Sequence, residues 1–133
     1  MGNWTAEEHT SGFCEAFVVA AKRERLLRLL SGRRRSAGVV ALAHPDCIDL
    51  SRASAWTSGD PVELADLLRA AGAPAEVYLI SNYDVLDHRT MMLTGASAAV
   101  LNLGLGTVIS AIPGKLAFYE GEYGKGSRYV LKA

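Results

Sequence analysis

The alternation of apolar and polar residues is clearest between Thr107 and Glu122, where two apolar runs flank Pro113-Gly114. Proline presets φ at the first central position of a turn, and glycine accepts positive φ at the second. We therefore predict a hairpin with strands Thr107–Ile112 and Lys115–Glu120. Pro-Gly favours a type II turn, whose twist suits a two-residue hairpin less well. A bulge or a wider loop is therefore an alternative to the two-residue turn. With a two-residue loop, the two faces of the hairpin would be Ile109, Ala111, Leu116 and Phe118 on one side, and Val108, Ile112, Ala117 and Tyr119 on the other. Since both faces are apolar, the hairpin should lie inside a sheet.

Helical patterns dominate the first part of the chain. Thr5 and Glu8 fit a capping box, but Ser11-Gly12 should keep that helix short, and residues 1–14 could form a loosely ordered segment. A stronger helix is predicted from about Glu15 to Leu30, where leucines form one stripe and basic residues the other. Gly32 then suits the end of this helix.

The middle of the chain is less uniform. Ser36–Ala43 could be a short buried strand or a second helix, because its length and residue propensities do not decide. No periodicity is sustained from Asp46 to Gly59, which indicates an irregular connection. Asp60-Pro61 then begins a helix that should end near Ala71. We expect its inward-facing residues to be Val62, Leu64, Leu67 and Leu68.

The remaining elements give the fold class. We predict a strand over Glu76–Ser81, a polar loop over Asn82–Arg89, a buried helix rich in small residues over Leu93–Leu103, and a last strand over Arg128–Lys132. The expected fold is α+β. Its N-terminal helices and two further helices would pack on one face of a small, mostly antiparallel four-stranded sheet with a C-terminal hairpin.

Length, charge and cysteine content indicate what kind of protein has this fold. The 133 residues are the usual size of one domain, so we treat residues 1–133 as a single domain. The formal net charge is zero, which gives no overall attraction to nucleic acid or anionic lipid. Cys14 and Cys47 lack CxxC spacing and are expected to be reduced and buried, which favours a cytoplasmic protein. No apolar run is long enough for a membrane helix, so no membrane association is expected.

Three stretches resemble a small family of uncharacterised bacterial proteins: AKRERLLRLL, LAH and GTVISAIPGKLAFYEGE. The resemblance covers most of the chain after Phe17 and is most specific in PGKLAFYEGE. The family has no assigned activity, so the resemblance implies none for this chain. Its members look more helical where this chain has Ser36–Ala43, and this implies the helical alternative for that segment.

A run of basic residues is the first feature that could carry a function. Half of the 14 lysines and arginines lie in segment 22–35. Guanidinium groups pair with phosphate through two hydrogen bonds, so the segment could bind a nucleic-acid backbone. The candidate residues for this contact are Arg23, Arg28, Arg33, Arg34 and Arg35. The simpler alternative is a solvated helix face, which zero net charge and few interleaved aromatic residues favour.

Acidic residues after the Glu76–Ser81 strand are the second feature. Asp84, Asp87 and His88 lie in one loop, and Glu120 ends a hairpin strand. If these two strands were suitably placed, the acids could meet and bind a divalent cation or act as acid and base. The alternative is an ordinary polar turn, because no spacing matches a catalytic signature. His9, Cys14, His44 and Cys47 also lack the spacing of a zinc site, so we expect no metal site and no cofactor.

Three hypotheses about function follow from these features. We favour a small soluble binding or regulatory module without catalytic activity, whose partner is another protein or a second copy of the chain. The second hypothesis is nucleic-acid binding through the arginine-rich segment 22–35. The third is a small metal-assisted hydrolase that uses loop 82–89 and the end of the hairpin.

Overall fold

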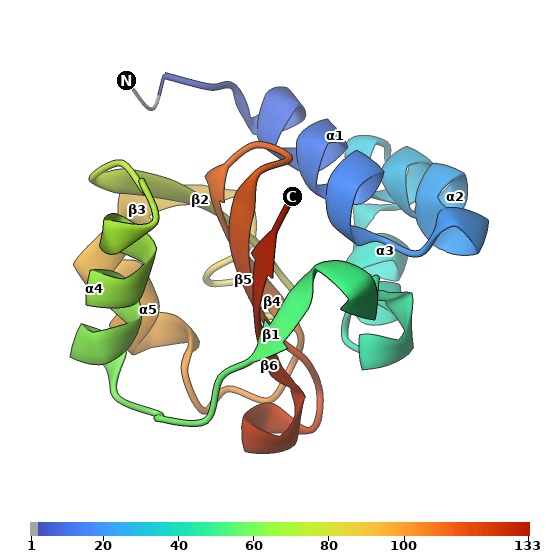
Figure 1. Ribbon diagram of the computed structural model, residues 1–133. Helices are drawn as coiled ribbons and strands as arrows, with labels where there is room; N and C mark the ends of the chain where they lie inside the picture. The colour runs from blue at the N-terminus through green and yellow to red at the C-terminus, as the bar shows by residue number, and fades with distance from the viewer. Residues whose placement is uncertain (1–2) are drawn as a thin grey trace.

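The computed structural model describes residues 3–133 and has an antiparallel sheet at its centre (Figure 1). The sheet has six strands in the order β1-β6-β5-β4-β2-β3. The strands are β1 (Ala53–Ala55), β2 (Glu76–Ser81), β3 (Arg89–Met92), β4 (Thr107–Ile112), β5 (Leu116–Glu120) and β6 (Arg128–Lys132). The α-helices are α1 (Ala6–Phe17), α2 (Ala20–Ser31), α3 (Arg35–Leu42), α4 (Pro61–Ala70) and α5 (Leu93–Val100). Short 3₁₀ turns η1 (Pro45–Cys47), η2 (Leu50–Arg52) and η3 (Gly124–Ser127) complete the chain.

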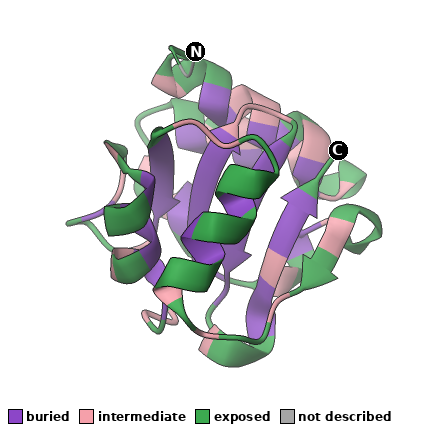
Figure 2. Cartoon of the chain, turned by 60° about the vertical axis from the view of Figure 1, so that its left-hand side comes forward, coloured by how far each residue is buried: buried purple, intermediate pink, exposed green. Residues whose placement is uncertain are grey.

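Helices cover both faces of this sheet (Figure 1). One core joins α1, α2 and α3 to the face that carries Tyr78, Val108 and Tyr119. A second core joins α4 and α5 to the face that carries Leu79 and Phe118. The predicted α+β class is confirmed, whereas the prediction of four strands with all helices on one face is wrong. The central strands are buried on both sides because each side has its own helical layer (Figure 2).

The hairpin is the centre of the sheet, as predicted. Strands β4 and β5 pair from Thr107–Glu120 to Ile112–Leu116, and the register shifts between Ser110 and Ile112. The predicted faces are confirmed for every residue except Ile112, which packs with the α4–α5 core. A bulge explains this difference, because one extra residue reverses the side on which the next side chain lies.

The N-terminal helix is longer than predicted. The Thr5–Glu8 capping box is present, but α1 continues through Ser11-Gly12 to Phe17. A Cβ atom built at Gly12 would lie 2.7 Å from the backbone nitrogen of Gly114. Gly12 therefore permits close contact between α1 and the hairpin turn and does not end the helix. Residues 6–14, for which we considered a loosely ordered segment, belong to α1; residues 1 and 2 lie outside the described part.

The predicted helix over Glu15–Leu30 is divided in two. Val18 and Val19 are extended between α1 and α2, and Val18 forms an isolated bridge with Ile48. The backbone nitrogen of Val19 donates to the carbonyl of Cys47, at 2.9 Å. β-Branched residues suit such an extended contact better than a helix interior. After this break, α2 packs against α3. Of the two alternatives for Ser36–Ala43, the helix is therefore confirmed, since α3 covers Arg35–Leu42.

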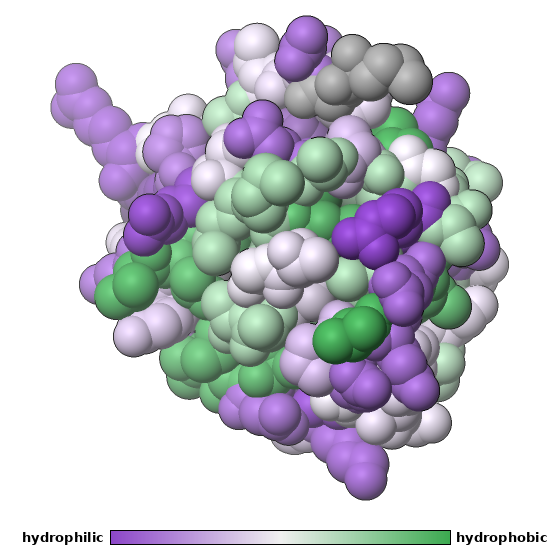
Figure 3. Space-filling model, turned by 90° about the vertical axis from the view of Figure 1, so that its left-hand side faces the viewer, coloured by the Kyte–Doolittle hydropathy of each residue, from purple (hydrophilic) through white to green (hydrophobic). Residues whose placement is uncertain are grey.

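The other differences concern short or exposed elements. Strands β1 and β3 lie at the two edges of the sheet. Strand β1 falls in the segment that we predicted to be irregular, and β3 begins at the last residue of the predicted loop and continues through residues 90–92, for which we predicted no element. On α4, the buried residues include Leu64 and Leu68, as predicted, but Val62 and Leu67 are 67% and 41% exposed. Helix α5 ends at Val100 and not at Leu103. Figure 3 shows the face over α4 and α5, where apolar side chains gather with charged ones around them.

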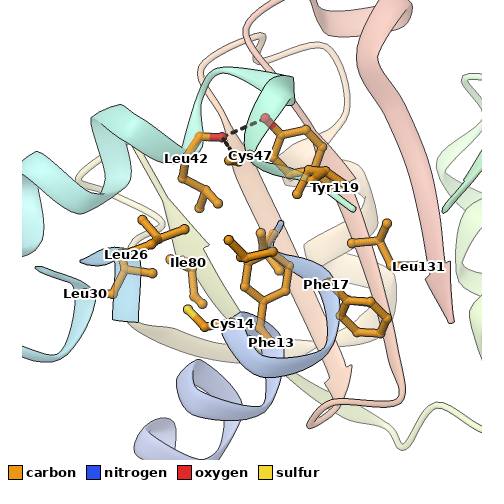
Figure 4. Packing of buried hydrophobic residues seen from close by; sticks show 14 of the residues in the cluster. Phe13, Cys14, Phe17, Leu26, Leu30, Leu42, Cys47, Ile80, Tyr119 and Leu131 are labelled. Carbon is orange, nitrogen blue, oxygen red and sulfur yellow. Dashed lines mark hydrogen bonds between the residues drawn. The ribbon is translucent and has the colours of Figure 1, made fainter. Parts of the chain in front are cut away.

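The α1–α3 core contains both cysteines (Figure 4). Cys14 and Cys47 are buried and unpaired, as predicted. Burial raises the pKa of Cys14 to about 12 and that of Cys47 to about 11, so both thiols are protonated at neutral pH. The carbonyl of Leu42 accepts hydrogen bonds from the Tyr119 hydroxyl, at 2.6 Å, and from the Cys47 thiol, at 3.7 Å. These bonds hold the end of α3 over the sheet. Among the described residues, no helix is both long and apolar enough to cross a membrane.

Candidate functional site

Arginine side chains gather at the corner between α2 and α3. Arg25, Arg28, Arg33 and Arg34 line a hollow of about 500 Å³ together with Leu29 and Gly32. Arg28 contacts the exposed carboxylate of Glu24 at 3.4 Å. Within residues 3–133, the other three arginines form no ion pair. The corner therefore concentrates positive charge that the protein itself leaves largely uncompensated.

A second hollow of about 400 Å³ lies next to the first and shares Arg25 and Leu29 with it. Its lining includes the apolar side chains of Leu26 and Ala41, and charged Lys22 and Asp46. Lys22 and Asp46 pair at 2.9 Å across an exposed position. We call the two hollows together the basic groove. Its lining residues are Lys22, Arg25, Leu26, Arg28, Leu29, Gly32, Arg33, Arg34, Ala41, His44, Asp46 and Cys47.

Two of the predicted nucleic-acid-binding arginines do not line this groove. Arg35 donates to both carboxylate oxygens of Asp87, at 2.7 and 2.9 Å. Arg23 donates to the carbonyl of Val18 at 3.1 Å, and its Nε atom is buried without a partner among the described residues. Arg23 and Arg35 therefore make contacts inside the fold, whereas Arg28, Arg33 and Arg34 line the groove. Nucleic-acid binding by these arginines stays a prediction.

Asp87 and His88 do lie close together, beside a buried tyrosine. The Tyr78 hydroxyl lies 2.6 Å from Nδ1 of His88 and accepts a hydrogen bond from Arg35 at 3.2 Å. The backbone nitrogen of Ser81 donates to Asp87 at 2.9 Å, which fixes the carboxylate under the arginine. Burial alone would raise the pKa of Asp87, but the hydrogen bonds from Arg35 and Ser81 outweigh it, and the net pKa is lowered. Asp87 is thus a charged, positioned group.

Glu120 lies elsewhere and has different partners. It is 1% exposed and accepts a hydrogen bond from Arg128 at 2.7 Å. The backbone nitrogens of Asn102 and Gly104 donate to its two oxygens, each at 3.0 Å. Glu120 therefore anchors the segment that follows α5 to the sheet.

The predicted meeting of acidic groups does not occur. Asp87 bonds to α3 on one side of the sheet, whereas Glu120 faces the α4–α5 side, as Phe118 two residues earlier does. Asp84 is exposed in the loop after β2. In the described part of the chain, no three His, Cys, Asp or Glu side chains are grouped closely enough to hold a metal ion. The carboxylates thus lack the convergence that the hydrolase hypothesis requires.

Several residues of the polar cluster around Tyr78 were not predicted to lie together. His9 of α1 stacks on Tyr78, with ring centroids 5.4 Å apart, and its Nδ1 atom lies 2.7 Å from the Ser110 hydroxyl. Tyr78 and Ser110 occupy strand positions whose side chains face the α1–α3 layer. A polar residue at an inward-facing strand position was the available signal, because a buried polar group needs a partner.

Burial of His9 should make stability depend on pH. Desolvation lowers its pKa from the ordinary value of 6.5, and the nearby carboxylate of Glu8 only partly opposes this. As pH falls through 6.5, the unfolded chain takes up a proton before the folded protein does, so the free energy of unfolding should decrease.

Urea denaturation at several pH values should show this decrease. It should be smaller in His9→Gln and unchanged in His44→Gln, which alters an exposed histidine. Equal pH dependence in His9→Gln and the wild type would contradict the assignment to His9.

We compared the chain with protein-family models, curated proteins and solved structures, and found no match in any of the three. The functional proposal is therefore based on the geometry of the chain itself.

Proposed function

We propose that the protein is a binding module without catalytic activity that recognises an acidic segment of another protein in its basic groove. The observation that carries this proposal is the gathering of Arg25, Arg28, Arg33 and Arg34 around one hollow, with an apolar floor beside it. A partner segment with carboxylates around a few apolar side chains would match both parts of the groove. The positive corner would also increase the rate of association with such a partner.

The residue types that line the basic groove favour a protein segment over nucleic acid as the partner. Leu29 and Ala41 offer apolar surface that water still reaches, and burying this surface against an apolar side chain of the partner would contribute roughly 25 cal/mol per Å². The residues that line the two hollows include no phenylalanine, tyrosine or tryptophan on which bases could stack.

The groove can accept a partner without rearrangement of the core. Arg33 and Arg34 are exposed in the turn between the helices. Gly38 allows α3 to approach α2, since a Cβ atom there would lie 2.9 Å from a methyl carbon of Leu30. The two helices therefore form a close-packed support, and a rigid surface loses less conformational entropy when it binds.

Selection from a displayed library of random peptides tests this proposal. The immobilised protein should enrich peptides that combine Asp or Glu with Leu, Ile or Phe at helical spacing. The same selection against Arg33→Ser/Arg34→Ser serves as the matched control and should not enrich that class. Enrichment of the same peptides by both proteins, or of peptides without acidic residues, would contradict the proposal.

A parallel titration with nucleic acids distinguishes the proposed protein partner from the nucleic-acid hypothesis. At moderate salt, labelled single-stranded DNA, duplex DNA and RNA should bind the wild-type protein weakly. Their affinity for the wild type should not exceed their affinity for Arg33→Ser/Arg34→Ser. Tight binding that is lost in this variant, with a steep dependence on salt, would instead show that the groove binds nucleic acid.

A further inference from the structure

We propose that a second site, between α1, the α2–α3 corner and β2, binds a small organic oxyanion. The site is a cavity of about 350 Å³, within the usual range for small-molecule pockets. Its polar lining comes from four elements, α1, α2, α3 and β2, and from the loop after β2. The residues used here are Glu7 and Thr10 of α1, Ser31 of α2, Arg35 of α3, Tyr78 of β2 and His88 of the loop after β2. This proposal is independent of the basic groove.

The hydroxyl of Tyr78 determines which ring nitrogen of His88 accepts a hydrogen bond and which one donates. Arg35 can only donate, so its bond to the Tyr78 oxygen, at 3.2 Å, leaves the hydroxyl proton free to point elsewhere. Nδ1 of His88 lies 2.6 Å from that oxygen and is the available acceptor. A neutral imidazole that accepts at Nδ1 carries its own proton on Nε2. His88 therefore has a donor left for a ligand.

Two further donors complete the set. Arg35 has five N–H groups, and four of them bond to Asp87, Tyr78 and the carbonyl of Leu30. Within residues 3–133, one N–H on Nη1 of Arg35 and the Ser31 hydroxyl have no hydrogen-bond partner. Three unpaired donors thus line one cavity, and this is the pattern that recognises a carboxylate or a phosphate.

Two polar groups near the donors, on Asp87 and Thr10, are already paired within the fold. The Asp87 carboxylate is occupied by Arg35 and by the backbone of Ser81. The Thr10 hydroxyl donates to the carbonyl of Ala6 at 2.9 Å. Glu7 is exposed at the α1 side of the cavity. The donors on α2, α3 and the loop therefore define the end that would hold the oxyanion.

The backbone at His88 supports a role beyond packing. Its φ is +59°, in the left-handed region that residues other than glycine occupy only rarely. This conformation places an exposed imidazole beside the buried Tyr78 hydroxyl. Strained backbone of this kind is concentrated at ligand sites, where the cost is compensated by function.

Titration of the ¹⁵N-labelled protein with benzoate and with phenyl phosphate tests the site, with benzyl alcohol as the neutral control. At least one anion should give saturable shifts at the backbone amides of Ser31, Arg35 and His88, below about 20 mM. Benzyl alcohol should not. The anion that binds more tightly will show whether the oxyanion is a carboxylate or a phosphate.

Two substitutions test the donors. His88→Asn keeps a side chain that tolerates positive φ but removes the imidazole, and it should weaken binding by about fivefold or more. Arg52→Asn, a change at an exposed residue that lines neither this cavity nor the basic groove, should leave binding unchanged. The proposal is overturned if neither anion gives saturable shifts at these amides, if benzyl alcohol gives the same shifts, or if His88→Asn binds as the wild type does.

Discussion

Replacing Glu120 with glutamine is expected to lower the free energy of unfolding by about 3–5 kcal/mol, because the change leaves a buried arginine without its counter-charge. Glu120 and Arg128 are each 1% exposed at the side chain and lie 2.7 Å apart. The carboxylate also accepts two backbone hydrogen bonds from the segment after α5. The amide that replaces it can accept through only one atom. Urea denaturation at pH 7 measures the loss.

A neighbouring acid provides the control for this prediction. Glu122 is exposed two residues later, so Glu122→Gln should change stability by less than about 0.5 kcal/mol. The double variant Glu120→Leu/Arg128→Met removes both charges and should be more stable than Glu120→Gln alone. A loss below about 1 kcal/mol for Glu120→Gln would mean that water or another group solvates Arg128.

Phe118→Ala should cost about 3–5 kcal/mol, since it removes a fully buried ring from the middle of the sheet. The ring lies in the α4–α5 core and packs edge-on against Trp56, with centroids 5.7 Å apart. A loss of this size is a large part of the total stability of an ordinary domain. Thermal and urea denaturation should both show it.

The matched comparison is a change at an exposed apolar residue. Val62→Ala, on the outer face of α4, removes side-chain carbons from water-accessible surface and should cost less than about 1 kcal/mol. If Phe118→Ala were as mild as Val62→Ala, the second core would not depend on this ring, and the assignment of the hairpin faces would be wrong.

Local patterns were sufficient to predict the elements whose cause is local. The Thr5 capping box, the Asp60-Pro61 helix start and the Pro113-Gly114 hairpin depend on residues a few positions apart, and all three are confirmed. The apolar character of both hairpin faces also pointed to a central position in the sheet. It did not reveal that each face has a separate helical layer, because periodicity shows that a face is buried but not which helix covers it.

The errors came from contacts between distant parts of the chain. Gly12 looked like a helix breaker, but it permits contact with the turn at Gly114. Val18 looked helical, but it pairs with Ile48. Strands β1 and β3 are short edge strands whose alternation is too brief to identify.

The same limit applies to the candidate sites. Arg35 and Asp87 are 52 positions apart, so nothing local distinguished Arg35 from the exposed Arg34 beside it. The clustering of charge in segment 22–35 was visible in the sequence. Which of its arginines remain available for a partner depends on how α2 and α3 pack, and the apolar floor of the groove depends on the same packing.

The most direct test of the basic groove is the affinity of a selected acidic peptide for two paired variants, measured by fluorescence anisotropy. Arg33→Ser/Arg34→Ser removes two groove arginines, whereas Arg52→Ser/Arg89→Ser removes two exposed arginines that do not line the groove. Both variants should unfold at nearly the wild-type temperature, because exposed charges contribute little to stability. The groove variant should bind about tenfold more weakly, and the control variant should bind as the wild type does. Equal affinity of the two variants for the peptide would contradict the proposed function.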